Sequence, residues 1–256
     1  MDKPHYSNDM DTGLKSFWSR FIDLNWKFGL FLIFIICIPR FILVLRANES
    51  GNYGTIGLIM ILSALTPFIF LNALGRKEIG ITKPKSYKWL LLAILSGLTA
   101  SIILHVMGQN LYPNSFENWY QYIGRSYKIQ EAITPHDRNI LFGIIALPGL
   151  IVSPLGEELF FRGIVHASFA KSMGAQKASI IDSTAFALTH LSHFGLVFIN
   201  NKWEFFTIPS IIWVISMFLI SILFYTFRKK SASILGAILC HSAFNLGMIF
   251  CIFYLL

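Results

Sequence analysis

Charged residues are scarce in this chain of 256 residues: they make up 13% of it, against roughly a quarter in an average soluble domain. Cysteine is scarce too, and Cys37, Cys240 and Cys251 are odd in number, with no disulfide or metal-binding spacing. No internal repeat, low-complexity stretch or basic stripe with interleaved aromatics is visible, so a repeat protein and a nucleic-acid-binding protein are not expected. The shortage of charge excludes an ordinary soluble domain.

Hydrophobic residues fill the chain instead, at 55% with 24 phenylalanines. Apolar runs of about 20 residues predict membrane spans. Seven such runs are present, and an eighth follows if one weak segment is added. We therefore expect an all-α fold, a polytopic transmembrane bundle of seven to eight helices with the active site inside it. The runs cover 28–45, 55–74, 88–107, 140–170, 178–198, 208–227 and 233–256.

The basic residues are unevenly divided between alternate connections. With the N-terminus in the cytoplasm, fifteen of the 21 lysines and arginines fall on the inner side and five on the outer side, Lys3 being among the former and Lys128 among the latter. This asymmetry predicts a cytoplasmic N-terminus and, for seven spans, an outer C-terminus. Arg40, which follows Pro39 inside the first run, is left out and is expected to snorkel outward. An integral protein of a bacterial cell membrane is expected, without a cleavable signal peptide.

Two segments outside the runs are rich in aromatics. Residues 1–27 form a cytoplasmic N-terminus in which apolar residues recur at helical spacing from Leu14 to Ile22, so a short amphipathic helix in the membrane interface is expected, ahead of one domain over 28–256. The connection 109–138 carries Trp119, Tyr120 and Tyr122, among others, which favours an interfacial aromatic belt or a surface helix over a substrate site.

Two adjacent carboxylates interrupt the fourth run, where a charge costs roughly 2.5–3.5 kcal/mol on insertion scales. Glu157 and Glu158 are followed by Arg162 at helical i+4 spacing from Glu158. The fifth run holds His190, four residues after Phe186, and the last run holds His241 and Asn245, also four apart. Three helices thus each bring a polar face to the bundle, which indicates an active site or an ion path. A carrier is disfavoured because no chain of acids crosses the remaining depth.

The three faces lie at similar depths. Counted from the nearest inner basic residues at 1.5 Å per residue, Glu157, His190 and His241 are about 21, 20 and 17 Å along their helices. They are therefore expected to converge. A carboxylate and an imidazole can deprotonate a water, while a second imidazole and a carboxamide can stabilise an oxyanion. We expect Glu158 to be tied to Arg162 and Glu157 to be free to act as the base.

The ordered set Glu157-Glu158-x-x-x-Arg162, Phe186-x-x-x-His190 and His241-x-x-x-Asn245 resembles the CAAX protease and bacteriocin-processing family of intramembrane endopeptidases. The resemblance covers about residues 139–250. It implies that Glu157 and His190 activate water, that His241 and Asn245 stabilise the oxyanion, and that Glu158 and Arg162 support the site. The substrate would be a peptide or protein at the bilayer, of the CAAX type or a leader-bearing peptide or bacteriocin, cut near the cytoplasmic leaflet.

Two alternatives remain open. The family is often described as a metalloprotease, and Glu157, Glu158, His190 and His241 would suit zinc, although Asn245 is better as a donor than as a zinc ligand, which favours a mechanism that needs no cofactor. The other alternative is a non-hydrolytic bacteriocin self-immunity protein or membrane scaffold. The remaining buried histidines, His105, His166 and His193, are expected to be interhelical hydrogen-bond partners, Phe186 a packing residue and the cysteines structural.

Overall fold

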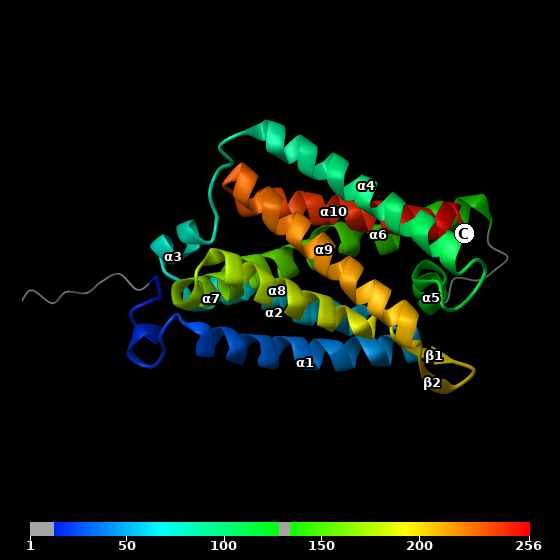
Figure 1. Cartoon of the computed structure of the whole chain (residues 1–256), viewed down its shortest axis with the longest axis horizontal. Helices are drawn as coiled ribbons and strands as arrows, with labels where there is room; N and C mark the ends of the chain where they lie inside the picture. The colour runs from blue at the N-terminus through cyan, green and yellow to red at the C-terminus, as the bar shows by residue number, and fades with distance from the viewer. Residues whose placement is uncertain (1–12, 128–133) are drawn as a thin grey trace, which may run out of the picture.

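Long helices run back and forth along one axis of the molecule, and the connections gather at its two ends (Figure 1). The computed structural model describes residues 13–127 and 134–256. Its long helical segments are α1 (Trp26–Ser50), α2 (Gly54–Phe70), α4 (Tyr87–Leu111), α6 (Pro135–Glu157) continued by the π-helical η2 (Glu158–Val165) and α7 (His166–Met173), α8 (Ala175–Thr189), α9 (Thr207–Ser231) and α10 (Ile234–Tyr254).

Five of these segments are long and apolar enough to cross a membrane, namely α1, α4, α6 with its continuation to Met173, α9 and α10. The helix α2 is apolar but shorter. An all-α membrane bundle is therefore present, since the described strands form one small hairpin. The count of seven to eight spans stays a prediction for α2 and α8.

One end of the bundle, which we call the basic end, gathers the N-terminal segment, α3 (Ala73–Glu78) and the junctions α7–α8 and α9–α10 (Figure 1). Backbone hydrogen bonds join these parts: Ile234 N donates to Gly80 O at 2.8 Å, and Asn72 N donates to Gly13 O at 3.1 Å. The described basic residues of this end are Lys15, Arg20, Lys27, Arg76, Lys77, Lys83, Lys85, Lys88, Lys171, Lys177, Arg228, Lys229 and Lys230.

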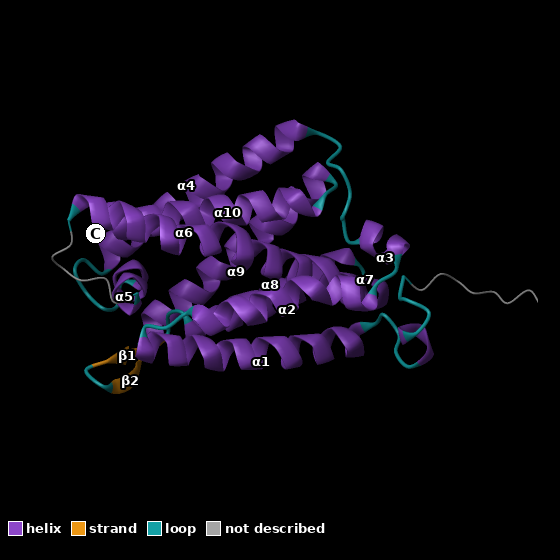
Figure 2. Cartoon of the chain, turned by 180° about the vertical axis from the view of Figure 1, so that it is seen from behind, coloured by secondary structure: helices purple, strands orange, loops and turns teal. Residues whose placement is uncertain are grey.

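The opposite end, the hairpin end, holds α5 (Trp119–Ser126), the strands β1 (Leu196–Ile199) and β2 (Lys202–Phe205) and the C-terminus (Figure 2). The strands pair antiparallel, with Leu196 opposite Phe205, around a turn in which Asn200 and Asn201 adopt positive φ. Its described basic residues are Arg46, Arg125, Arg138 and Lys202. Lys3 and Lys128 lie outside the described residues. Arg162, which the prediction counted on the inner side, is buried inside the bundle, and the other basic residues counted in the prediction separate along the axis.

Three expectations were wrong in detail. From residue 13 to residue 25 the chain forms a loop with a single 3-10 turn, η1 (Trp18–Arg20), in place of the expected amphipathic helix, because hydrogen bonds hold it against the end of α2: Lys15 N donates to Phe70 O and Trp18 Nε1 to Ile69 O. The fifth helix ends at Thr189, since β1 follows. The aromatic residues of α5 do not form an interfacial belt: Trp119 and Tyr120 are fully buried, because this helix folds back onto α4 and both side chains donate to carbonyls of α4.

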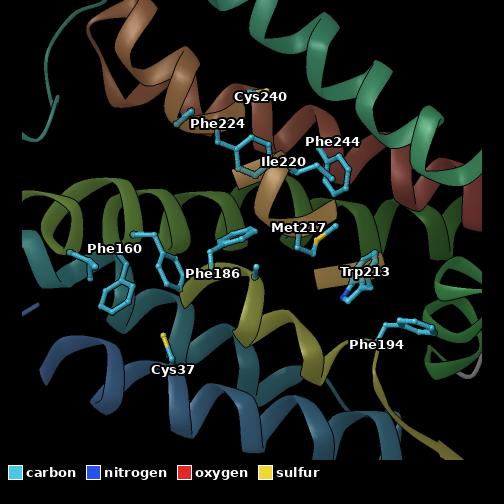
Figure 3. Packing of buried hydrophobic residues seen from close by; sticks show 14 of the residues in the cluster. Cys37, Phe160, Phe186, Phe194, Trp213, Met217, Ile220, Phe224, Cys240 and Phe244 are labelled. Carbon is cyan, nitrogen blue, oxygen red and sulfur yellow. The ribbon is translucent and has the colours of Figure 1, made fainter. Parts of the chain in front are cut away.

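The buried core lies between the helices and is dominated by aromatic rings. Figure 3 shows Phe186 of α8 in the middle of the bundle, near side chains of α9 and α10, which are Met217, Ile220, Phe224 and Phe244. The helices α2 and α6 cross closely at Gly156, where an added Cβ would lie 2.6 Å from Met60 O. This crossing brings the acidic pair, next in the chain, into the middle of the bundle.

Candidate active site

The acidic pair lies where the geometry of its helix changes. Glu157 is the last residue of α6, and Glu158 is the first residue of the π-helical η2. Pro154 just before it has no N–H, so it leaves the Leu150 carbonyl without its usual helical donor. Ser242 of α10 donates to that carbonyl at 2.7 Å. Pro154 thus removes one hydrogen bond of α6 just before the acidic pair, and Ser242 replaces it with a bond from α10. Turns of π-helix often mark functional sites.

Glu157 is buried, at 2% exposure, and is held by its oxygen Oε1. Arg40 of α1 donates to Oε1 at 2.8 Å as an ion pair, and Ser153 donates to the same oxygen at 2.7 Å. Glu157 Oε2 has no hydrogen-bond partner among the described residues and lies 3.7 Å from His190 Nε2. One carboxylate oxygen is therefore fixed, and the other faces an imidazole.

His190 directly follows α8 and presents one ring nitrogen to Glu157. Its Nδ1 lies 2.7 Å from the Phe186 carbonyl, which can only accept, so Nδ1 carries a proton. In the neutral ring Nε2 is then an acceptor. The Phe186 ring lies against the imidazole at a centroid distance of 4.2 Å, and Trp213 Nε1 donates to the His190 carbonyl at 3.0 Å. Backbone and ring are both fixed.

Glu158 is the fully buried centre of a second charged group. Its Oε1 lies 3.2 Å from Arg162 Nη1 and 2.7 Å from His241 Nδ1. Arg162 in turn donates to Ser221 Oγ at 2.6 Å, and its guanidinium lies over the Phe186 ring at 4.4 Å. The predicted Glu158–Arg162 pair is present. It also contains His241, whose position the sequence had not linked to Glu158.

The α10 residues line the other side of the centre. The His241 ring stacks on Phe224 at 4.5 Å with an interplanar angle of 15°. Asn245, one turn further, donates through Nδ2 to the Gly149 carbonyl at 2.9 Å, beside the loosened turn of α6. One N–H of the Asn245 amide therefore holds α10 against α6. The second N–H of the same amide is not used in this contact.

All four of Glu157, His190, His241 and Asn245 line one cavity of about 670 Å³. Its walls are mostly apolar and come from α2, α6, α9 and α10. Ile61 and Ile144, which are 50% and 61% exposed on the outer surface of the bundle, also line it, so the cavity reaches the gap between α2 and α6. The sequence-predicted residues thus meet at the wall of a space large enough for several side chains.

Two expectations about the site were wrong. Arg40 does not snorkel outward but is 3% exposed and points into the bundle, since a buried carboxylate offers it a partner. Glu157 is consequently not free. This pairing could not be predicted, because α1 is apolar on all sides and its inward face cannot be read from periodicity.

The other polar residues have local roles. His166 forms a buried pair with Asp182, with Nδ1 and Oδ2 at 2.7 Å, which joins α7 to α8. His105 packs edge-on against the Tyr120 ring. His193 lines the cavity next to His190, with ring centroids 5.4 Å apart. Cys37, Cys240 and Cys251 are buried and unpaired by disulfides.

The arrangement does not fit a zinc ion. Within the described residues, no three His, Cys, Asp or Glu side chains converge so that they could hold a metal. Glu157 and Glu158 each face a different arginine, and His241 Nδ1 is taken by Glu158.

Residues 139–247 match the family model of the Rce1-like type II CAAX prenyl endopeptidases. This segment of the chain is Rce1-like. The match confirms the resemblance drawn from the motifs, and the Rce1-like segment contains all six candidate residues, Glu157, Glu158, Arg162, His190, His241 and Asn245. Arg40 lies outside it.

The Rce1-like segment implies a CAAX-type endopeptidase, which would act on peptides at the bilayer. The apolar helices around it indicate an integral membrane protein. Neither the comparison with curated proteins nor that with solved structures gives a significant match.

Proposed function

We propose that this protein is an intramembrane peptidase that hydrolyses a peptide bond with a water activated jointly by Glu157 and His190. The observation that supports it is the pairing of two acceptors: the open Glu157 Oε2 and the bare His190 Nε2, 3.7 Å apart. That distance is too long for a direct hydrogen bond, but one water beside the pair can donate a proton to each. Its oxygen lone pair then points away from both, toward a carbonyl carbon in the cavity.

The proton balance follows from these positions. The water oxygen bonds to the carbonyl carbon while its proton passes to Glu157 or His190, and the carbonyl becomes an oxyanion. The oxyanion collapses, the C–N bond breaks, and the same proton goes to the leaving amine. Arg40 and Ser153 keep the Glu157 carboxylate in place during both steps, because they bind the oxygen that takes no part.

Asn245 and His241 are the proposed oxyanion donors. The second N–H of Asn245 is available on the cavity wall. His241 directs Nδ1–H to Glu158, so its Nε2 can donate only as an imidazolium. The carboxylate of Glu158 balances that positive charge, so Glu158 would be the counter-ion of His241 as well as of Arg162. Loss of one such donor typically costs 10²–10³-fold in kcat.

The test uses the purified full chain in vesicles and a library of quenched fluorescent peptides with apolar residues at varied positions. Glu157→Gln, His190→Ala and His241→Ala should each abolish cleavage while leaving membrane insertion intact. Elemental analysis of the same preparation measures bound metal directly. If all three variants cleaved a peptide as fast as the unaltered chain, the assignment would be wrong.

A further inference from the structure

The helix α1 forms one hydrogen bond to Glu157 and another to the turn that contains His190. Arg40 donates to Glu157 Oε1 at 2.8 Å, and Asn48, further along the same helix, donates through Nδ2 to the Ser192 carbonyl at 2.7 Å. Ser192 is the last residue of the 3-10 turn η3 (His190–Ser192). The two contacts lie about 12 Å apart along α1, at 1.5 Å per residue. Arg40 and Asn48 are both buried, so the same side of α1 reaches both parts of the centre.

The Ser192 carbonyl follows the end of α8, where carbonyls lose their helical donors. Ser192 is fully buried, so a donor from another element is needed to satisfy it. Its own hydroxyl is used within the segment, where it donates to the Thr189 carbonyl at 2.7 Å. A carbonyl can only accept, which fixes the orientation of the Asn48 amide: its nitrogen faces Ser192, and its oxygen faces the Tyr53 hydroxyl at 2.8 Å.

The turn η3 determines where the His190 ring lies relative to Glu157. Its backbone is closed by the bond from His193 N to the His190 carbonyl at 3.0 Å. Trp213 of α9 donates to the same carbonyl, and Asn48 of α1 binds the other end of the turn. The 3.7 Å between His190 Nε2 and Glu157 Oε2 is the gap beside which the proposed water lies. A misplacement of about 1 Å in such a geometry can cost roughly 10²-fold in rate.

We infer that Asn48 is a positioning residue of the proposed peptidase, because its bond to the Ser192 carbonyl holds the His190 turn at a fixed distance from Glu157. The inference rests on the proposed function and adds a residue to it. Arg40 fixes the carboxylate and Asn48 fixes the turn of the imidazole, so one rigid helix sets the distance between the two groups. Both residues lie outside the segment 139–247 that matches the family model.

Asn48→Leu tests this role, since leucine is close to asparagine in size and has no donor. With the purified full chain in vesicles and a peptide that it cleaves, kcat should fall roughly 10²-fold. KM should stay close to that of the unaltered chain, because the imidazole moves and the substrate-binding walls do not. Asn48→Gln keeps the carboxamide on a longer stem and should recover part of kcat. If Asn48→Leu does not fold, Asn48→Ala lacks the same donor and replaces it.

Tyr120→Phe is the matched control. It removes another buried bond from a side chain to a carbonyl of a different helix, from Tyr120 to Ser101 at 2.7 Å, which has no link to the His190 turn. Its kcat should stay close to that of the unaltered chain, and its midpoint of thermal unfolding in detergent shows what the loss of such a bond costs in stability. An equal fall of kcat in Tyr120→Phe and Asn48→Leu would overturn the inference, since the loss would then follow stability alone.

The kinetic constants separate positioning from substrate contact. Asn48 also lines the cavity, so a raised KM with unchanged kcat in Asn48→Leu would assign it to substrate binding and overturn the inference. An unchanged kcat and KM would overturn it as well. Glu157→Gln is assayed beside it: full activity of Glu157→Gln would reject the peptidase mechanism itself. An inactive Glu157→Gln beside a fully active Asn48→Leu would reject only the role of Asn48.

Discussion

At the scale of single residues, the main result is that the acidic pair is divided between two cations. Glu157 binds Arg40, and Glu158 binds Arg162 together with His241. Each buried carboxylate thus has its own positive partner, as the cost of an unpaired charge in a membrane requires. Glu157 Oε2 and Glu158 Oε2 are both left without a hydrogen-bond partner among the described residues, and of the two it is Glu157 Oε2 that faces the imidazole of His190.

Arg40 provides the most direct test at this scale. Arg40→Met removes the donor to Glu157 Oε1 and should lower kcat by at least 10²-fold, since the carboxylate loses both its position and its counter-charge. Arg40→Lys keeps the charge but not the planar fork and should retain part of the activity, with KM close to that of the unaltered chain. Steady-state kinetics of both variants measure this. Equal loss in both, with a raised KM, would indicate a purely structural arginine.

Variants at Asn245 and Ser242 distinguish a role in oxyanion stabilisation from a role in holding α6 against α10. Asn245→Ala removes the proposed oxyanion donor together with the bond to the Gly149 carbonyl, and kcat should fall by roughly 10²–10³-fold. Ser242→Ala is the matched control, because it removes only the neighbouring bond from α10 to the Leu150 carbonyl. Its kcat should fall far less. A control variant as inactive as Asn245→Ala would mean that the α6–α10 contact, not the amide, matters.

At the scale of elements, the site depends on two departures from regular helix. Pro154 and the following π-helical segment change the direction of the side chains after Glu157, and α8 ends early so that His190 lies at its terminus. Sequence periodicity assumes 3.6 residues per turn throughout, so it could place these residues at one depth but could not give their pairings.

The crossing of α2 and α6 can be tested with matched glycines of one helix. Gly156→Ala would place a methyl group 2.6 Å from the Met60 carbonyl, a backbone atom that cannot rotate away. We expect a lower midpoint of thermal unfolding in detergent and reduced activity. Gly143→Ala meets no atom within 4 Å and should leave both unchanged or raise the midpoint slightly. Similar midpoints for the two variants would contradict the tight crossing.

The sequence predicted much of the fold because apolar runs and spacing are local signals. The runs agree with the long helices to within a few residues, apart from the fifth, where Asn200-Asn201 between alternating apolar residues was a recognisable hairpin turn. The candidate site residues stand out in the sequence for the same reason, since their spacing within each helix is a local signal. The inward position of Arg40 was not predicted because its partner lies on another helix. The spacing of residues within one helix carries no information on which residue of another helix it contacts.

At the scale of the whole molecule, the separation of basic residues along the axis predicts the side of each end. A reporter fused after Leu256 should lie outside the cell, and one fused after Lys230 should lie inside. Alkaline phosphatase would therefore be active in the first fusion and inactive in the second, with green fluorescent protein giving the opposite result. Activity of phosphatase after Lys230 would show that the bundle is inverted.

The Arg40–Glu157 ion pair also imposes an order of events during biosynthesis. Its two residues are 117 positions apart, so α1 leaves the ribosome and enters the membrane long before its counter-charge exists. For that interval α1 carries an arginine whose insertion costs roughly 2.5–3.5 kcal/mol at mid-bilayer. Its mean hydropathy of 2.7, the highest of the five candidate spans, offsets that cost. The apolar residues of α1 are therefore expected to keep this helix inserted until α6 supplies the counter-charge of Arg40.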